Sequence, residues 1–186
     1  MAHRMISDEQ LYETALDLFR TYGYEGVSLQ RLSAATGLEK ASLYYRYPGG
    51  KDDIAKSVAQ GVVHWFQSNI FAALLSDLPP RRKVATVADR LRAFYGGGRK
   101  SCITEILSIP GGPEELRAGL KAALQAWIKA FAEVARQSGM STPIAKARAE
   151  EAISRIEGSL ILARVLEDTG PFERALRLLP DLLTKE

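Results

Sequence analysis

Apolar residues recur every three or four positions along most of the chain. This spacing is typical of amphipathic α-helices that turn one stripe toward a core. Strict alternation of apolar and polar residues, which would indicate half-buried strands, does not compete with it. The pattern therefore predicts an all-α fold of about nine helices, three short ones followed by about six more. They are expected over residues 8–22, 28–35, 39–47, 51–76, 82–95, 101–108, 113–137, 143–168 and 171–183.

Start and stop signals divide the first fifty residues into three short helices. Ser7 and Gln10 have the spacing of a capping box, which predicts the start of the first helix, and Gly23 offers a left-handed stop. Ser28 can cap the second helix, and Gly37 lies in the turn before the third. Two short helices joined by a tight turn are the elements of a helix-turn-helix, whose second helix enters the DNA major groove.

The third predicted helix carries side chains that suit contact with DNA. Leu38 and Leu43 can point inward onto the first two helices, which leaves a polar flank outside. On that flank Lys40 and Ser42 can reach base edges, and Ala41 can touch a thymine methyl group. Phenol, guanidinium and ammonium groups that follow match phosphate oxygens. The predicted DNA-binding residues are Ser28, Lys40, Ala41, Ser42, Tyr44, Tyr45, Arg46 and Lys51.

Charge and aromatic content also allow a simpler interpretation of this stretch. Tyrosines at helical spacing are more often half-buried packing residues than ligands, and Tyr47 fits that role at the end of the first helix. The net charge is only +3, and acids balance bases over residues 1–51. The local arrangement favours DNA nonetheless, because residues 40–51 contain three bases and no acid. Ser28 and Lys51 also stand at predicted helix starts, where free backbone N–H groups attract phosphate.

Residues 8–54 contain an ordered set of motifs: an alanine-rich first helix with Leu18-Phe19, Gly23-Tyr24, a second helix after Ser28, the turn Ala35-Thr36-Gly37-Leu38, Ser42-Leu43-Tyr44 and the closing Lys51. With these motifs the stretch resembles the N-terminal DNA-binding domain of TetR-type transcriptional repressors. The resemblance implies that residues 40–45 face an operator and that Tyr44, Lys51 and Ser28 bind phosphate.

Two residues depart from the usual pattern of that family, which commonly places His and then Phe where this chain has Arg46 and Tyr47. Tyr47 can keep the packing role of the Phe, and Arg46 would strengthen contact with the DNA backbone. The closing loop at residues 48–51 and the stretch 156–164 are similar to the YxaF and LmrA-like subgroup.

In such a repressor the C-terminal helices make a homodimer. Apolar residues wrap around most of the helix expected over residues 143–168, and the small residues Gly158, Ser159 and Ala163 would let a second backbone approach closely. We therefore expect an interface resembling a four-helix bundle, although a helix that is central within one chain has the same pattern. The predicted dimer-interface residues are Ile156, Ser159, Leu160, Ala163, Phe172, Leu176 and Leu179.

A dimer would hold two recognition helices roughly 34 Å apart, one turn of DNA, so that they read a palindromic operator together. The expected effector is a small, mostly apolar molecule that alters this separation through the helix beginning at Lys51. Candidate effector-binding residues are large side chains on the middle helices, each of which also fits an ordinary core position. They are Trp65, Phe66, Asn69, Phe94, Tyr95, Ile103, Trp127 and Phe131.

Several functional classes find no support in the sequence. Cys102 is the single cysteine, so an internal disulfide and a cysteine-based zinc site are excluded; it could sense oxidants if exposed, or be buried and inert. The uncharged run 57–76 contains too many polar residues for a membrane span, and residues 1–7 lack the apolar region of a signal peptide. We expect a cytoplasmic protein.

An enzyme is not indicated, because the chain has no glycine-rich phosphate loop, no HExxH and no nucleophile elbow, and no cofactor is expected. The predicted domains are a DNA-binding domain over residues 1–51 and an effector-binding and dimerisation domain over 52–186. The alternative is a helical ligand-binding or adaptor protein without sequence-specific DNA binding.

Overall fold

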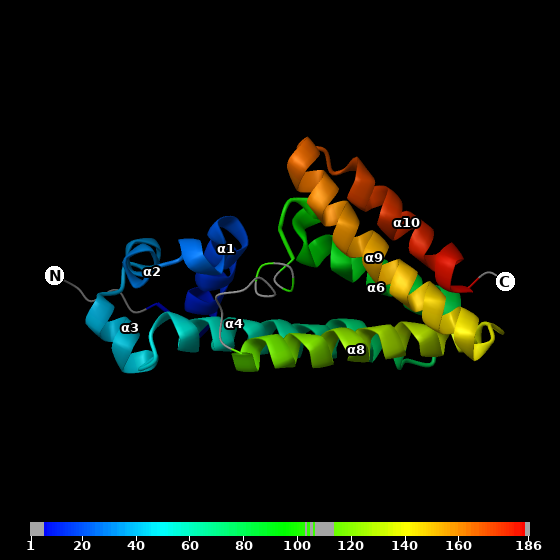
Figure 1. The fold of residues 1–186 in the computed structure, drawn as a ribbon, viewed down its shortest axis with the longest axis horizontal. Helices are drawn as coiled ribbons and strands as arrows, with labels where there is room; N and C mark the ends of the chain where they lie inside the picture. The colour runs from blue at the N-terminus through cyan, green and yellow to red at the C-terminus, as the bar shows by residue number, and fades with distance from the viewer. Residues whose placement is uncertain (1–5, 103, 105, 107–113, 185–186) are drawn as a thin grey trace. The chain divides into compact units, whose positions relative to one another are not determined.

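The computed structural model describes residues 6–102, 104, 106 and 114–184, all of them in helices, turns or loops. The all-α prediction is confirmed, since the described residues contain no strand. The elements in chain order (Figure 1) are α1 (Asp8–Gly26), α2 (Leu29–Thr36), α3 (Lys40–Arg46), α4 (Lys51–Phe66), the π-helical segment η1 (Gln67–Phe71), α5 (Ala72–Leu74), α6 (Pro80–Phe94), the 3-10 segment η2 (Gly96–Gly98), α8 (Glu114–Gln137), α9 (Thr142–Leu166) and α10 (Gly170–Thr184).

The chain divides into two compact units. The N-terminal unit comprises the described residues of 1–63 and 103–120, and the C-terminal unit comprises those of 64–102 and 121–186. The helices α4 and α8 each contribute residues to both units. The compact units therefore divide within α4 and not at its start, whereas the functional domain boundary at Lys51 stays a prediction.

Local sequence signals set the ends of the first helices. Ser7 Oγ accepts a hydrogen bond from the Gln10 amide, and the Gln10 side chain accepts one from the Ser7 amide, so the predicted capping box is present. Gly23 has φ 70° and interrupts α1, as the stop signal predicted. This interruption at Gly23 lets the ring of Tyr24 stack on that of Phe19, with ring centroids 6.1 Å apart, in the core of the N-terminal unit.

Gly61 of α4 lies against the ring of Tyr12 on α1. A Cβ at this position would lie 2.2 Å from Tyr12 Cε2 and 2.7 Å from Cζ, so a side chain here would collide with the ring. Both residues belong to the N-terminal unit. The missing side chain of Gly61 therefore allows α1 to pack directly against the first part of α4.

The C-terminal unit is built around α6, α9 and α10, where α10 packs against both of the others (Figure 1). Phe131, Phe172, Leu91 and Ile156 are fully buried in its core. Ion pairs on its surface link neighbouring helices. In one of them, Arg92 Nε of α6 lies 2.9 Å from Glu173 Oε2 of α10. The hydrogen bond to Glu173 is the largest cause that raises the pKa of Arg92.

The long helix predicted over residues 51–76 is present, with a local change of helix type that the sequence did not predict. The chain stays helical to Leu74, but Gln67–Phe71 form a π-helical segment between α4 and α5. Asn69 lies in this segment and its side-chain amide donates to the carbonyl of Trp65 at 2.9 Å. Apolar spacing does not show such a local change of register, because it alters the pattern by one residue only. Half of the residues of the helix expected over 101–108 lie outside the described ranges.

Candidate DNA-binding and effector sites

Side-chain hydrogen bonds fix the turn between α2 and α3. Ser28 Oγ accepts a hydrogen bond from the Arg31 amide and caps α2, and Gly37 ends the helix with φ 72°. Ser33 Oγ donates to the Leu38 carbonyl at 2.6 Å, while the Leu38 amide donates to Thr36 Oγ1 at 3.3 Å. These contacts give the two helices a defined crossing, which is the arrangement of a helix-turn-helix.

The helix α3 turns one residue inward and most of its polar side chains outward. Leu43 is completely buried, whereas Tyr44 and Tyr45 are 52% and 89% exposed. Lys40 and Ala41 are exposed as well, and Ser42 is half-buried. Lys40 makes no hydrogen bond or ion pair with any other described residue. The outer flank that the sequence predicted is therefore accessible on the surface of the N-terminal unit.

Lys51, the first residue of α4, lies in a small network with the end of α1. Its ammonium group donates to the Tyr24 carbonyl at 3.2 Å, lies 4.1 Å from the Tyr24 ring centroid and is 3.8 Å from Glu25. The Tyr24 hydroxyl donates to Asp52. Burial, and then this hydrogen bond, raise the pKa of Tyr24 above its usual range. The sequence did not indicate Tyr24, Glu25 or Asp52 as partners of Lys51.

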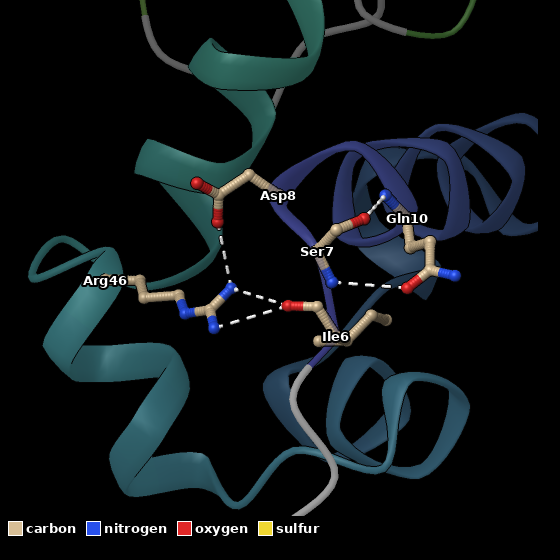
Figure 2. Close-up of polar contacts among 5 residues, drawn as sticks. All are labelled: Ile6, Ser7, Asp8, Gln10 and Arg46. Carbon is tan, nitrogen blue, oxygen red and sulfur yellow. Dashed lines mark hydrogen bonds and ion pairs between the residues drawn. The ribbon is translucent and has the colours of Figure 1, made fainter.

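Arg46, the last residue of α3, contacts the segment that leads into α1 (Figure 2). Its Nη1 donates to Asp8 Oδ1 at 3.0 Å, and both Nη atoms donate to the Ile6 carbonyl at 3.5 Å. The sequence predicted a DNA-phosphate contact for this guanidinium group. The structure instead shows it engaged with Asp8 and Ile6.

Six of the eight predicted effector residues form one aromatic cluster in the C-terminal unit. Trp65 stacks on Phe94 with centroids 4.1 Å apart, and Phe66 meets Trp127 edge-on at 5.1 Å. Trp65, Phe66 and Phe94 are half-buried, whereas the other three rings are buried. The contacts continue from Phe94 to Tyr95 and from Trp127 to Phe131.

Four further observations bear on the predicted effector site. Asn69 uses its amide within its own helix, and Ile103 lies outside the described residues. The indole N–H of Trp127 is buried without a hydrogen-bond partner among the described residues. Grooves of about 560 Å³ beside Ile128 and about 470 Å³ beside Lys56 are not lined by the aromatic cluster.

Family comparisons agree with this geometry. Residues 11–58 match the family described as bacterial regulatory proteins, tetR family, and residues 81–177 match the C-terminal domain of LmrA/YxaF-like transcriptional regulators. The second match covers more than half of the chain. The chain belongs to the TetR family. It is thus a DNA-binding transcriptional regulator of the LmrA/YxaF-like group and not an enzyme, as the sequence predicted.

Individual relatives of this TetR-family regulator extend over its full length. The transcriptional regulator LmrA of Bacillus subtilis is 26% identical and covers 96% of this chain and 97% of its own. A TetR-family regulator from Agrobacterium tumefaciens has the same fold, with a TM-score of 0.81 at 20% identity over 95% of this chain and 96% of its own. A cysteine mutant of CifR, described as complexed with operator DNA, gives 0.73 at 21% identity and covers 98% of both chains.

The seven predicted interface residues of this TetR-family regulator are all buried in its own C-terminal unit. Ile156 and Leu160 of α9 and Leu176 of α10 are almost inaccessible in the single chain, and the hydroxyl of Ser159 donates to the Ile156 carbonyl. Their place in a dimer interface stays a prediction. The large exposed apolar side chains of the same two helices are Ile144, Ile161, Leu162, Val165, Leu166 and Leu178.

The remaining predictions for this TetR-family chain concern the thiol of Cys102, a membrane span and a metal site. Cys102 is buried and lies between the Tyr95 hydroxyl, at 3.5 Å, and Glu157 Oε1, at 3.3 Å. Among the described helices, none combines the length and apolar character that a membrane span requires. Within the described ranges no group of three or more His, Cys, Asp or Glu side chains is arranged to hold a metal ion.

Proposed function

We propose that the protein is a repressor that binds a palindromic operator as a homodimer and is released by a small, mostly apolar effector. The observation that carries the DNA-binding part is the outward flank of α3 on a helix-turn-helix. Its exposed Lys40 and Ala41 present a cation and a methyl group, which read guanine edges and thymine methyls in a major groove. Tyr44, Tyr45 and Ser42 supply hydroxyl groups for phosphates and bases beside them.

Phosphate binding at the rim of this surface is supported by two helix starts. Both α2, which Ser28 caps, and α4 begin here, and the first turn of a helix has backbone N–H groups without an intrahelical partner, which attract phosphate. Lys51 adds a positive charge at the second start, held in place by the Tyr24 carbonyl. These contacts set the register of the protein on the duplex and carry no base information.

The dimer that we propose uses the exposed face of α9. Gly158, Leu162, Val165 and Leu166 share one side of this helix, because they are spaced at four, seven and eight residues. A Cβ on Gly158 would meet nothing within 4 Å in the single chain. A row of exposed apolar side chains beside a glycine suits close approach of an identical helix from a second copy. Leu178 of α10 extends the same apolar character.

The effector site that we propose is the accessible edge of the aromatic cluster. Trp65, Phe66 and Phe94 are only partly buried, and a flat apolar molecule or side group can replace water there. The buried N–H of Trp127 is a donor that an acceptor atom of the effector can satisfy. Tyr95 and Phe131 are fully buried and act as the support behind these rings. An effector with a 100-fold preference for the released state supplies roughly 2.7 kcal/mol of coupling.

Gel-shift titrations of two variants test the base-reading assignment. Tyr44→Ala should weaken binding to the selected operator and to a scrambled duplex by similar factors, because a phosphate contact is blind to sequence. Lys40→Ala should weaken operator binding about tenfold more than scrambled binding, because a base contact contributes about 1–3 kcal/mol of discrimination. Equal losses from Lys40→Ala on both duplexes would contradict base reading. Wild-type affinity that does not distinguish the two duplexes would favour the adaptor alternative.

A further inference from the structure

We propose that Arg46 is a positioning residue that fixes the recognition helix α3 on the N-terminal unit, in place of the phosphate contact that its sequence position suggests. Its guanidinium group links the last turn of α3 to Ile6 and Asp8 at the start of α1. The inference rests on the DNA-binding function proposed above and concerns how the reading surface is held.

The geometry of the guanidinium group carries the proposal (Figure 2). Nη1 reaches both Asp8 Oδ1, at 3.0 Å, and the Ile6 carbonyl, which also accepts from Nη2. These contacts join residues that are 38 and 40 positions apart in the chain. The rigid planar fork of an arginine can span two such acceptors at once, which an ammonium group cannot do with the same geometry.

The two acceptors are themselves held in place by the capping box of α1. The Ser7 amide donates to Gln10 Oε1 at 3.2 Å, and the Gln10 amide donates to Ser7 Oγ at 3.1 Å (Figure 2). Ser7 lies between Ile6 and Asp8 in the chain, so the reciprocal cap fixes the backbone on which both acceptors stand. Arg46 therefore binds to an ordered helix start.

Few other contacts hold the C-terminal end of α3, because the hydrogen bonds of the turn from α2 act at its opposite end. The helix has seven residues, which is too short to be stable alone in water. Its N-cap residue, Glu39, makes no side-chain capping bond, and Leu43 is its one buried residue. The contacts of Arg46, at the opposite end of α3 from Lys40, consequently limit rotation of this helix about Leu43. The base-reading residues near the start of α3 depend on this angle.

The electrostatic surroundings of Arg46 argue against a phosphate contact. The Asp8 carboxylate, 3.0 Å from Nη1, would repel a phosphate that approached the same nitrogen. The Arg46 side chain is 30% exposed, whereas its partner Asp8 is 91% exposed, so the acid is the more accessible of the two groups. Lys40, by contrast, is exposed and has no charged partner among the described residues.

A double-mutant cycle in DNA binding separates positioning from phosphate contact. Arg46→Ala, Asp8→Ala and the double variant are titrated against the selected operator and a scrambled duplex at four salt concentrations. We expect each single variant to weaken operator binding about fivefold, which is the scale of a surface ion pair. The double variant should be no weaker than Arg46→Ala, and the slope of log affinity against log salt should stay unchanged.

Two further variants serve as controls for the double-mutant cycle. Glu9→Ala removes an acid from the same first turn of α1 without touching Arg46, so it measures the general effect of one lost negative charge. Arg46→Lys keeps the charge but not the fork, and the positioning role predicts a loss close to that of Arg46→Ala. These two surface variants, with helix content checked by circular dichroism, keep the test valid if Arg46→Ala folds poorly.

The opposite set of results would overturn the proposal. If Arg46 contacts phosphate, Arg46→Ala lowers the salt slope by about 0.9, Arg46→Lys retains operator affinity, and Asp8→Ala behaves like Glu9→Ala. Loss of discrimination between operator and scrambled duplex in the wild type would defeat the proposed function itself. Additive losses in a wild type that discriminates would defeat only the positioning role.

Discussion

The contact between Gly61 and Tyr12 allows a quantitative prediction for Gly61→Ala. A methyl group there would lie 2.2 Å from Tyr12 Cε2, so the ring must move out of its half-buried place on α1. Overpacking of this kind costs typically about 1–3 kcal/mol, and so close a contact lies toward the upper end. Replacing a glycine inside a helix by alanine raises the free energy of unfolding by about 1 kcal/mol, because alanine has the higher helix propensity. We therefore expect a net loss of about 2 kcal/mol.

Urea unfolding followed by circular dichroism, at one fixed protein concentration, measures this change. In the Tyr12→Ala background the same Gly61→Ala change should stabilise by about 1 kcal/mol, because the collision is gone and the helix propensity remains. Gly119→Ala in α8 is the matched control, since a Cβ there meets nothing within 4 Å, and it should stabilise by a similar amount. Equal effects of Gly61→Ala in both backgrounds would refute the reasoning.

Three other predictions concern the C-terminal unit. Val165→Asp, at a residue that is 70% exposed, should leave helix content unchanged but convert the proposed dimer to monomers in sedimentation velocity. Leu75→Asp, at an apolar residue that is 82% exposed, should leave the dimer intact. Phe131→Ala should lower the unfolding free energy by about 3–5 kcal/mol in urea titrations, because the ring is fully buried. Glu151 has its pKa lowered first by the hydrogen bond from Arg155, so its stabilising effect is present above about pH 5 and is lost as the pH falls through the lowered pKa. The stability difference between wild type and Glu151→Gln should shrink over the same pH range.

The start of α1 and both ends of α2 could be predicted from the sequence because their causes are local. The Ser7 capping box, the Ser28 cap and the left-handed Gly37 all involve residues within three or four positions of one another. The same holds for the inward Leu43, whose burial follows from its place between polar neighbours on a short helix. The helix-turn-helix and its outer flank were therefore predicted from pattern alone.

The faces of α9 could not be assigned from the sequence. Apolar residues lie on both sides of this helix, and the pattern does not tell which side its own unit covers. The small residues Ser159 and Ala163 suggested an approach of a second copy, but the chain's own core covers them. Gly158 lies on the opposite, open side.

Contacts between residues that are far apart in the sequence could not be predicted from it either. Nothing in the sequence pairs Arg46 with Asp8, or Gly61 with Tyr12, since both contacts depend on how α1 meets α3 and α4. The charge on Arg46 therefore suggested phosphate, while its partner could be recognised only in the folded unit. Under the positioning role that we propose for Arg46, long-range packing decides which of the basic residues remain available for DNA.

Selection of bound duplexes from a random pool tests the central claim most directly. The account predicts enrichment of an inverted repeat whose half-sites are centred about one helical turn apart, as two α3 helices in a symmetric dimer require. It also predicts that Lys40→Ala selects a degenerate version of the same repeat. Recovery of no common sequence, at salt that permits binding, would contradict the account.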